Sequence, residues 1–326
     1  MRPIVAALLA WVLTPPVLAA DPDAALGRAL GYLAREVPDW PKSNHCFSCH
    51  NNGDAARALY EARRLGVKPA IAPATLESTT AWLAQPGRWA HNGGEGPFSD
   101  TTLAQVQFTS ALAASVRSGT PANLSPLRDA AKALAALQSA DGAWPIAADP
   151  GTVGSPAGYG RPLATLSARN ALRLADPKTH ASAIARAEGW LLARPVASVM
   201  DASIVLLTLD GMPTGNADRK RQAFERLNQG QSTDGGWGPY VDAPPEVFDT
   251  ALALLALATQ PPNDATRRQI ALGRGYLAAT LGPDGSWPET TRPAGAGSYA
   301  ERVSTTGWAA LALLATRGIN APPAAP

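Results

Sequence analysis

The chain has 326 residues, a formal net charge of +2, 46% hydrophobic residues and only 17% charged residues. Its lysines and arginines are scattered rather than clustered, so the charge pattern does not indicate nucleic-acid binding or strong binding to a membrane surface. The hydrophobic share is mostly Ala and Leu, which fits helices buried on more than one face and allows a core of good size.

The first twenty residues read as a targeting segment. Arg2 precedes an apolar run over 4–13, and the small residues Ala19 and Ala20 follow. This pattern predicts a cleavable signal peptide over residues 1–20, too short to span a membrane. No cysteine follows the cleavage site and no long apolar stretch follows in the chain, so we expect neither a lipid anchor nor stable membrane insertion. The mature protein is therefore predicted to be periplasmic or secreted.

The strongest chemical signal lies at residues 45–50. Cys46 and Cys49 are the two cysteines of the protein, and with His50 they form the pattern C-x-x-C-H. This pattern is the attachment signature of a c-type haem. On a helix, positions 46, 49 and 50 share a face, so both thiols can form thioethers while the His50 imidazole binds the iron. The sequence thus predicts one covalently attached haem c, with Cys46, Cys49 and His50 as its binding residues.

Two other interpretations of the segment stay open. An exported protein can close Cys46 and Cys49 into a disulfide, as redox-active C-x-x-C pairs do. A zinc site is the other, but zinc needs four ligands and would have to recruit His45, His50 or His91.

The second axial ligand of the iron is ambiguous. His91 is the first candidate because it lies in the loop of the second repeat, which corresponds to the loop carrying the haem segment. Met200 is the second candidate, and it precedes the fourth inner helix and would reach across the ring. His/His and His/Met pairs both suit electron transfer, whereas an open sixth position suits small-ligand chemistry. Weaker candidates are His45, His180 and Met212, with His180 expected at the surface.

The rest of the chain repeats with a period of about 50 residues. Short helical segments with a small residue, an aromatic residue and a leucine recur, and most are followed by a Gly- or Pro-rich turn with a tryptophan. Asp, Ser or Thr then often marks the start of a more apolar helix, as at Asp249. The tryptophans at these turns are Trp40, Trp89, Trp144, Trp237 and Trp287.

No segment has the alternation of a half-buried strand. We therefore expect an all-α fold, an α/α toroid of about six helix hairpins with inner and outer helix rings. It would form a single domain over residues 21–318, with the haem-attachment segment at 45–50 near one mouth of the ring. Residues 319–326 are expected to be a disordered tail.

Two segments resemble the QW repeat of squalene-hopene cyclases. Gln138 and Gln231 each stand six residues before a tryptophan, whereas the third copy has Leu281 at that position. The run 247–252 also resembles the start of an inner cyclase helix. The resemblance covers most of residues 24–317 and implies the α/α toroid shared with protein prenyltransferases. We expect the tryptophans to fasten neighbouring hairpins together rather than to take part in chemistry.

The catalytic motifs of such proteins are missing. No D-x-D-D motif for alkene protonation occurs, so cyclase activity is not expected, and Asp249 reads as an N-cap. Both cysteines lie in C-x-x-C-H, which leaves none for a prenyltransferase zinc site. Toroid enzymes acting on polysaccharides use a basic residue as proton acceptor, and the candidates here are Lys220, Arg292 and Arg302.

The function predicted from sequence is a periplasmic monohaem c-type cytochrome on a cyclase-like toroid, serving electron transfer or haem-dependent redox chemistry. Its partner would be a redox protein or a small apolar molecule, without nucleic acid. The alternative is a cavity enzyme or binding protein for an apolar, isoprenoid-like ligand, and whether the chain is an enzyme stays open. Phe47 and Phe98 are candidates for packing on the porphyrin, and Phe108, Tyr159, Tyr299 and Trp308 for an aromatic cavity wall.

Overall fold

A computed structural model describes residues 20–90, 100–120, 124–147, 153–212, 215–261, 263–290, 292 and 297–319. Its described residues form helices and no strand, and none of these helices has the length and apolar character needed to cross a membrane. The elements are α1 (Pro22–Asn44), η1 (Cys49–Ala55), α2 (Ala56–Arg64), α3 (Pro73–Leu83), η2 (Pro86–Arg88), α4 (Thr101–Arg117), α5 (Ser125–Ala136), α6 (Gly160–Ala175), α7 (Ala181–Ala193), α8 (Val199–Leu209), α9 (Ala217–Gly230), α10 (Val247–Ala258), α11 (Asp264–Thr280) and α12 (Tyr299–Ala315).

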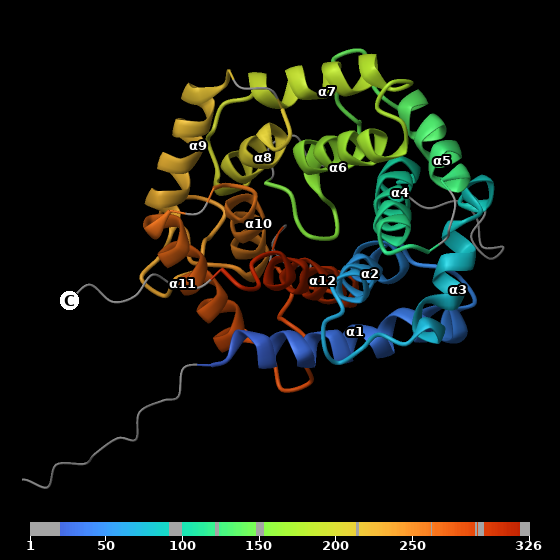
Figure 1. Cartoon of the computed structure of the whole chain (residues 1–326), viewed down its shortest axis with the longest axis horizontal. Coiled ribbons are helices and arrows are strands. Elements are labelled where there is room, and N and C mark those ends of the chain that lie inside the picture. Colours follow the sequence, from blue (N-terminus) through green and yellow to red (C-terminus); the bar gives the residue numbers. More distant parts are fainter. Residues whose placement is uncertain are drawn as a thin grey trace, which may run out of the picture.

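The helices form two concentric rings (Figure 1). The even-numbered helices make the inner ring, in which α2, α4, α6, α8, α10 and α12 each pack on the next and α12 packs back on α2. The odd-numbered helices make the outer ring, and each leads into the inner helix that follows it. The predicted α/α toroid of six helix hairpins is therefore confirmed for the described part of the chain.

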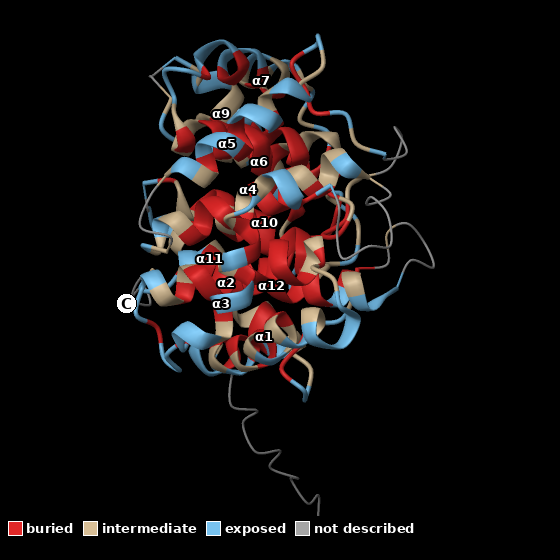
Figure 2. Cartoon of the chain, turned by 90° about the vertical axis from the view of Figure 1, so that its right-hand side faces the viewer, coloured by how far each residue is buried: buried red, intermediate tan, exposed pale blue. Residues whose placement is uncertain are grey.

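Burial follows the two rings (Figure 2). The inner helix α10, with the sequence VFDTALALLALA, is apolar around most of its circumference and is almost entirely buried. The outer helix α9, ADRKRQAFERLNQG, buries only Ala223, Leu227 and Gly230. A helix that is apolar all round requires neighbours on every side, which only the inner ring provides.

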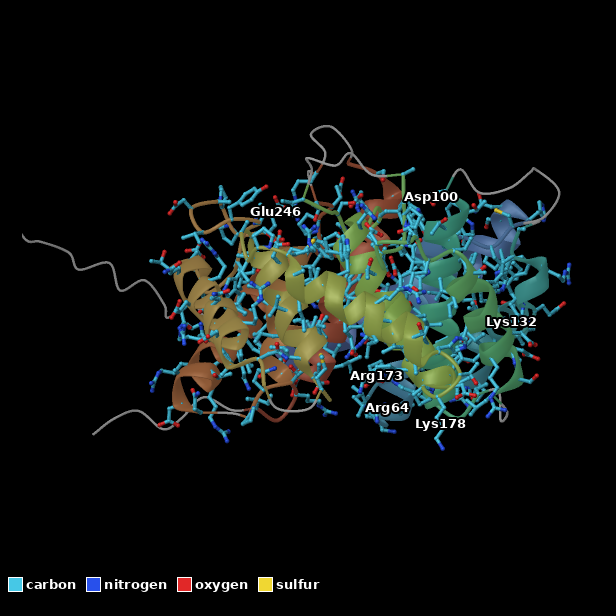
Figure 3. The ribbon with its side chains drawn as sticks, turned by 90° about the horizontal axis from the view of Figure 1, so that it is seen from above. Arg64, Asp100, Lys132, Arg173, Lys178 and Glu246 are labelled. Carbon is cyan, nitrogen blue, oxygen red and sulfur yellow. The ribbon has the colours of Figure 1, made fainter. Side chains whose placement is uncertain are left out.

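The inner helices all run in the same direction along the axis of the ring. Figure 3 shows Asp100 and Glu246, which precede α4 and α10, at one end of this axis. It shows Arg64 and Arg173, near the ends of α2 and α6, at the other. We call the end where inner helices begin the amino rim and the opposite end the carboxyl rim. Acidic residues at helix starts and basic residues at helix ends stabilise the helices, because each lies next to the end of the helix dipole that has the opposite charge.

Three tryptophan turns join the hairpins in the same way. At Trp237 the indole Nε1 donates to Leu227 O of the preceding outer helix at 2.8 Å, and the backbone N donates to Thr250 Oγ1 of the next inner helix at 2.9 Å. Gln231 extends the joint by donating to Gln269 O of α11 at 3.0 Å. The turns at Trp144 and Trp287 repeat the indole and backbone bonds. The tryptophan bonds thus join the outer and inner helix of one hairpin. The next hairpin is reached by Gln231 and by Gln138, which donates to Ala183 O of α7 at 2.9 Å, and by the Trp237 ring, which lies against Gly273 of α11.

The first hairpin departs from the expected pattern. Trp40, expected in a turn, lies inside α1, which continues through Pro38 and Pro41 to Asn44. Its ring stacks on Tyr299 of α12 at a centroid distance of 5.4 Å. The contact joins the first helix of the ring to the last one. It favours a longer outer helix over a turn at residue 40.

Candidate functional site

The C-x-x-C-H segment lies at the amino rim, between α1 and α2. The prediction that residues 46–50 share one helix is wrong, because residues 45–48 are non-helical and the helix begins only at Cys49. The reason is a cap at Ser48, whose hydroxyl accepts hydrogen bonds from the backbone N–H groups of His50 and Asn51. Cys46 therefore lies in the loop, while Cys49 and His50 form the first turn of the π-helix η1.

Two asparagines tie this turn to α1. Asn52 Nδ2 donates to Val37 O at 3.0 Å, a carbonyl that has no donor in α1 because the residue four positions on is Pro41. Asn52 Oδ1 accepts from Ser48 N at 3.0 Å. Asn51 Nδ2 donates to Glu36 O at 3.2 Å. The interruption of the α1 hydrogen bonding by proline thus provides the acceptor that orients the segment.

Each nitrogen of the His50 imidazole lies near a neighbouring side chain. Its Nδ1 lies 3.5 Å from Ser304 Oγ of α12, and its Nε2 lies 3.8 Å from Cys49 Sγ. Burial lowers the pKa of His50 to about 4, so the ring is neutral at pH 7. A neutral imidazole with Nδ1 facing a hydroxyl keeps Nε2 for a metal, which is how protein partners orient histidine ligands.

The two cysteines are not bonded to each other in this structure. Burial raises the pKa of the Cys49 thiol to about 12, whereas redox-active and zinc-binding cysteines need an accessible thiolate. Within the described residues, no group of three or more His, Cys, Asp or Glu side chains could hold a metal ion. Among the described residues the segment thus offers one histidine and two thiols, without the set of ligands that zinc needs.

A surface cavity of about 380 Å³ lies beside Cys46 and Phe47. It is lined by residues 45–47 and by side chains of α3 and η2, including Trp82. Phe47 stacks on Trp82 with centroids 4.7 Å apart, so Phe47 is fixed by an aromatic partner. Phe98, the other aromatic candidate, lies outside the described residues.

Behind His50 a buried carboxylate organises the centre of the ring. Asp54 accepts hydrogen bonds from Ser304 Oγ at 3.2 Å, Gln107 Nε2 at 2.9 Å and the Tyr159 hydroxyl. Arg57 Nη1 lies 3.6 Å from Asp54 Oδ1 and donates to Tyr159 OH at 3.1 Å. Burial raises the pKa of Asp54 to about 6, although Arg57 and the hydrogen bonds act to lower it. His50 is thereby linked through Ser304 to a charged network.

Close packing brings this network together. Gly307 of α12 has no Cβ, and one built there would lie 3.0 Å from Ala55 Cα of η1. A larger residue at 307 would therefore push α12 away from η1 and separate Ser304 from His50 and Asp54.

A second polar cluster surrounds Asp249. The prediction that Asp249 is an N-cap is wrong, because α10 begins at Val247 and Asp249 lies in its first turn. Its carboxylate instead pairs with Arg292 Nη2 at 2.7 Å, and Arg292 Nε lies 3.7 Å from Glu246. Burial raises the pKa of Asp249 to about 7, and its Oδ1 has no hydrogen-bond partner among the described residues. α12, which packs on α10, begins at Tyr299 with Ser298 as its cap.

The candidates for the second axial ligand are widely separated. His91 lies outside the described residues. Met200 is buried in the first turn of α8, which packs on α6, α7, α9 and α10 and lies across the ring from α2 (Figure 1). His180 precedes α7 as expected but is buried rather than exposed at the surface. His45 adjoins the segment itself, and Met212 follows α8.

The four candidate wall aromatics do not form one wall. Tyr159 and Trp308 meet edge to face at 5.7 Å, but Phe108 packs with Trp82 and Tyr299 stacks on Trp40. The candidate proton acceptors are likewise dispersed. Arg292 pairs with Asp249, Arg302 pairs with Glu289 at 3.1 Å, and Lys220 lies over the Phe224 ring.

The lumen of the ring contains a chamber of about 480 Å³ at its carboxyl rim. Every inner helix contributes to its lining. Trp308 lies against Arg57, whose guanidinium carbon is 4.5 Å from the ring centroid. The Asp54 network and the chamber are thus in contact through Arg57.

Sequence reasoning did not find the Asp54 network. Its members Asp54, Gln107, Tyr159 and Ser304 come from four parts of the chain, so no local pattern joins them. One signal was available, since Asp54 stands one helical turn after His50 on a segment without other acidic residues.

No family model and no curated protein matches this chain. Solved structures do match. A protein from Actinoplanes is 17% identical with a TM-score of 0.59, covering 91% of this chain and 100% of the other. The type II terpene cyclase MstE from Scytonema, without ligand, is 14% identical with a TM-score of 0.56, covering 91% and 99%. A possible member of the GH105 family from Klebsiella pneumoniae is 12% identical with a TM-score of 0.57, covering 95% and 98%. At these identities the likeness establishes the fold alone.

Proposed function

We propose that this protein is a periplasmic monohaem c-type cytochrome built on an α/α toroid. Cys46 and Cys49 would carry the thioether bonds and His50 would bind the iron. The observation that carries the proposal is the C-x-x-C-H pattern at the amino rim, together with a neutral His50 whose Nδ1 faces Ser304. When bound, the haem supplies one-electron redox chemistry, serving electron transfer or oxidation and reduction of a small molecule.

The residues around the segment have definite tasks in this proposal. Ser304 orients the imidazole through Nδ1, and Asp54 in turn accepts from Ser304. Such a partner keeps the histidine in one tautomer and makes Nε2 a better donor to a metal. Asn51 and Asn52 keep the turn in place through backbone acceptors of α1. Residues 1–20 as a signal peptide belong to the same proposal, because c-type haem is attached after export.

The deciding experiment is an intact mass with a pyridine haemochrome spectrum. The mature protein should be produced in a host with haem-maturation machinery. We expect a mass increase equal to one haem and a spectrum of two thioether bonds. Cys46→Ala/Cys49→Ala should lose both signals, whereas His45→Ala, next to the segment, should keep them. A wild-type protein carrying its polypeptide mass alone would overturn the proposal.

The second axial ligand is assigned by a spectrum of the reduced protein with and without carbon monoxide. If His91 or Met200 binds the iron, the wild type should bind carbon monoxide slowly and the corresponding alanine variant rapidly. Met212→Ala serves as a control methionine. Rapid binding by the wild type would instead indicate an open sixth position.

A second candidate function is binding of an apolar molecule within the ring. The specific observation in its favour is the carboxyl-rim chamber, because about 480 Å³ lies within the usual range for small-molecule sites, roughly 300–1,000 Å³. The neighbour MstE has been solved with geranylgeranyl dihydroxybenzoate, an isoprenoid compound. Saturable binding of a short-chain amphiphile, measured by calorimetry, tests this candidate without reference to haem.

A further inference from the structure

The chamber at the carboxyl rim has two chemically different parts. Its wall is formed largely by leucines and alanines of the inner helices, with Trp308 among them. Leu207, Leu255 and Leu311, from α8, α10 and α12, are only partly buried although they belong to the inner ring. Inner-ring leucines that keep exposed surface leave apolar area for a ligand to cover, at roughly 25 cal/mol per Å².

The polar part of the lining is positively charged. Four arginines line the chamber, Arg57, Arg117, Arg169 and Arg173, against a single carboxylate, Asp210. The guanidinium groups of Arg57 and Arg169 are satisfied from behind, by Asp54 and by Glu188. The lining therefore favours a negative over a positive ligand group.

Arg117 and Arg173 lie at the mouth. They belong to the last turns of α4 and α6, and their side chains are 53% and 33% exposed. Arg117 pairs with Glu61 at 3.1 Å, and Arg173 Nη2 donates to the backbone carbonyl of Gly211 at 3.1 Å. Arg173 Nη1 also lies 3.8 Å from Glu188 Oε1, so both arginines have an acidic partner. Because each guanidinium group has five N–H donors and both side chains reach solvent, each can bind a further anion while it keeps that partner.

We propose that this chamber binds an anionic amphiphile, with its apolar tail among the leucines and its carboxylate or phosphate head between Arg117 and Arg173. The inference rests on the second candidate function and not on the haem, because no residue of 45–50 lines the chamber. The inference specifies the charge of the ligand and its orientation in the chamber. An apolar tail that enters first leaves the charged head at the mouth, beside the two arginines.

The test is isothermal titration calorimetry with decanoate and with decyltrimethylammonium, which share a chain length and differ in charge. We expect saturable binding of decanoate and at least about tenfold weaker binding of the cation. Leu311→Trp, which fills the chamber, should weaken decanoate binding about tenfold or more, whereas Leu272→Trp on the outer face of α11 should not.

The head group is tested by Arg117→Gln/Arg173→Gln, which should weaken decanoate binding about fivefold or more and should not weaken binding of the cation. Arg221→Gln, an exposed arginine on α9, is the matched control and should change neither. A thermal melt of each variant checks folding. Cys46→Ala/Cys49→Ala should bind decanoate as the wild type does.

The outcomes separate the proposals. Equal affinity for the anion and the cation overturns the charged-head inference and leaves the apolar-ligand function standing. Absence of saturable binding for both ligands overturns both. Decanoate binding that Leu311→Trp does not weaken places the ligand elsewhere and overturns the chamber as its site. None of these results depends on whether the intact mass shows haem.

Discussion

The hairpins joined by tryptophan turns and the hairpin that carries the C-x-x-C-H segment solve the same packing problem with different chemistry. At Trp144, Trp237 and Trp287 the joint consists of an indole donor, a threonine acceptor and a left-handed glycine. At the first hairpin the tryptophan lies within α1, and asparagines make the joint instead. The comparison teaches that repeated joints maintain the ring, while the irregular one is free to hold a functional group.

The largest expected effect breaks a repeated joint. Trp237→Ala removes a fully buried indole and leaves Leu227 O without its donor, so it should lower the free energy of unfolding by about 3–5 kcal/mol. Trp40→Ala, at the irregular joint, removes a partly exposed ring and should cost less than half of this. Urea unfolding measures both. Equal losses of unfolding free energy would show that the two kinds of joint contribute equally to stability.

The second prediction concerns the glycine of the same joint. Gly235 has φ +88°, and a Cβ there would lie 2.6 Å from Leu272 O of the next outer helix. Gly235→Ala should therefore destabilise by about 2–4 kcal/mol through backbone strain and the clash. Gly189→Ala is the control, because nothing lies within 4 Å and the site is inside α7. It should raise stability by about 0.5–1 kcal/mol in the same unfolding assay.

The third prediction tests the irregular joint. Asn52→Ala removes the donor to Val37 O and the acceptor for Ser48 N, both buried, and should cost about 2–3 kcal/mol. Under the proposed function we also expect a lower yield of protein carrying haem, measured by the ratio of haem absorbance to protein. Gln231→Ala, which loses two hydrogen bonds to backbone carbonyls at a repeated joint, should lower stability without changing that ratio. If Gln231→Ala lowered the ratio of haem absorbance to protein as much as Asn52→Ala does, the two kinds of joint would have the same effect on the C-x-x-C-H segment.

The fourth prediction is a pH dependence. Asp249 has a pKa raised to about 7, so the folded protein binds a proton that the unfolded chain releases at lower pH. Its contribution to stability is therefore present at low pH and declines as pH rises from about 4 to about 7. The stability of Asp249→Asn relative to wild type should rise across this window and then level off.

Denaturant unfolding from about pH 5 to about pH 8 measures this difference. Asp141→Asn is the matched control, since hydrogen bonds from Ser139 and Ala143 and the Arg161 pair lower the pKa of Asp141 to about 2. Its effect should be constant over the same range. A flat difference for Asp249→Asn would mean that the Arg292 pair keeps Asp249 charged throughout.

Much of the fold could be predicted because each repeat is recognised from residues that are close together in the sequence. The apolar character of 251–258, the Asp-Gly turns and the indole positions each require only neighbouring residues to recognise. The extent of α1 could not be predicted, because Trp40 stays helical through its contact with Tyr299, which is 259 positions away. Asp249 was misread for the same reason, since its partner Arg292 follows a whole helix later.

The sequence by itself determined the number of hairpins, the order of outer and inner helices and the position of C-x-x-C-H at the start of the first inner helix. Periodicity and turn residues decide these features within a few dozen positions. Only the tertiary structure decided that Ser304 and Asp54 stand behind His50, and that arginines and leucines of separate helices share one chamber. Closing the ring buries groups that are far apart in the chain next to one another, and burial sets their pKa values and partners.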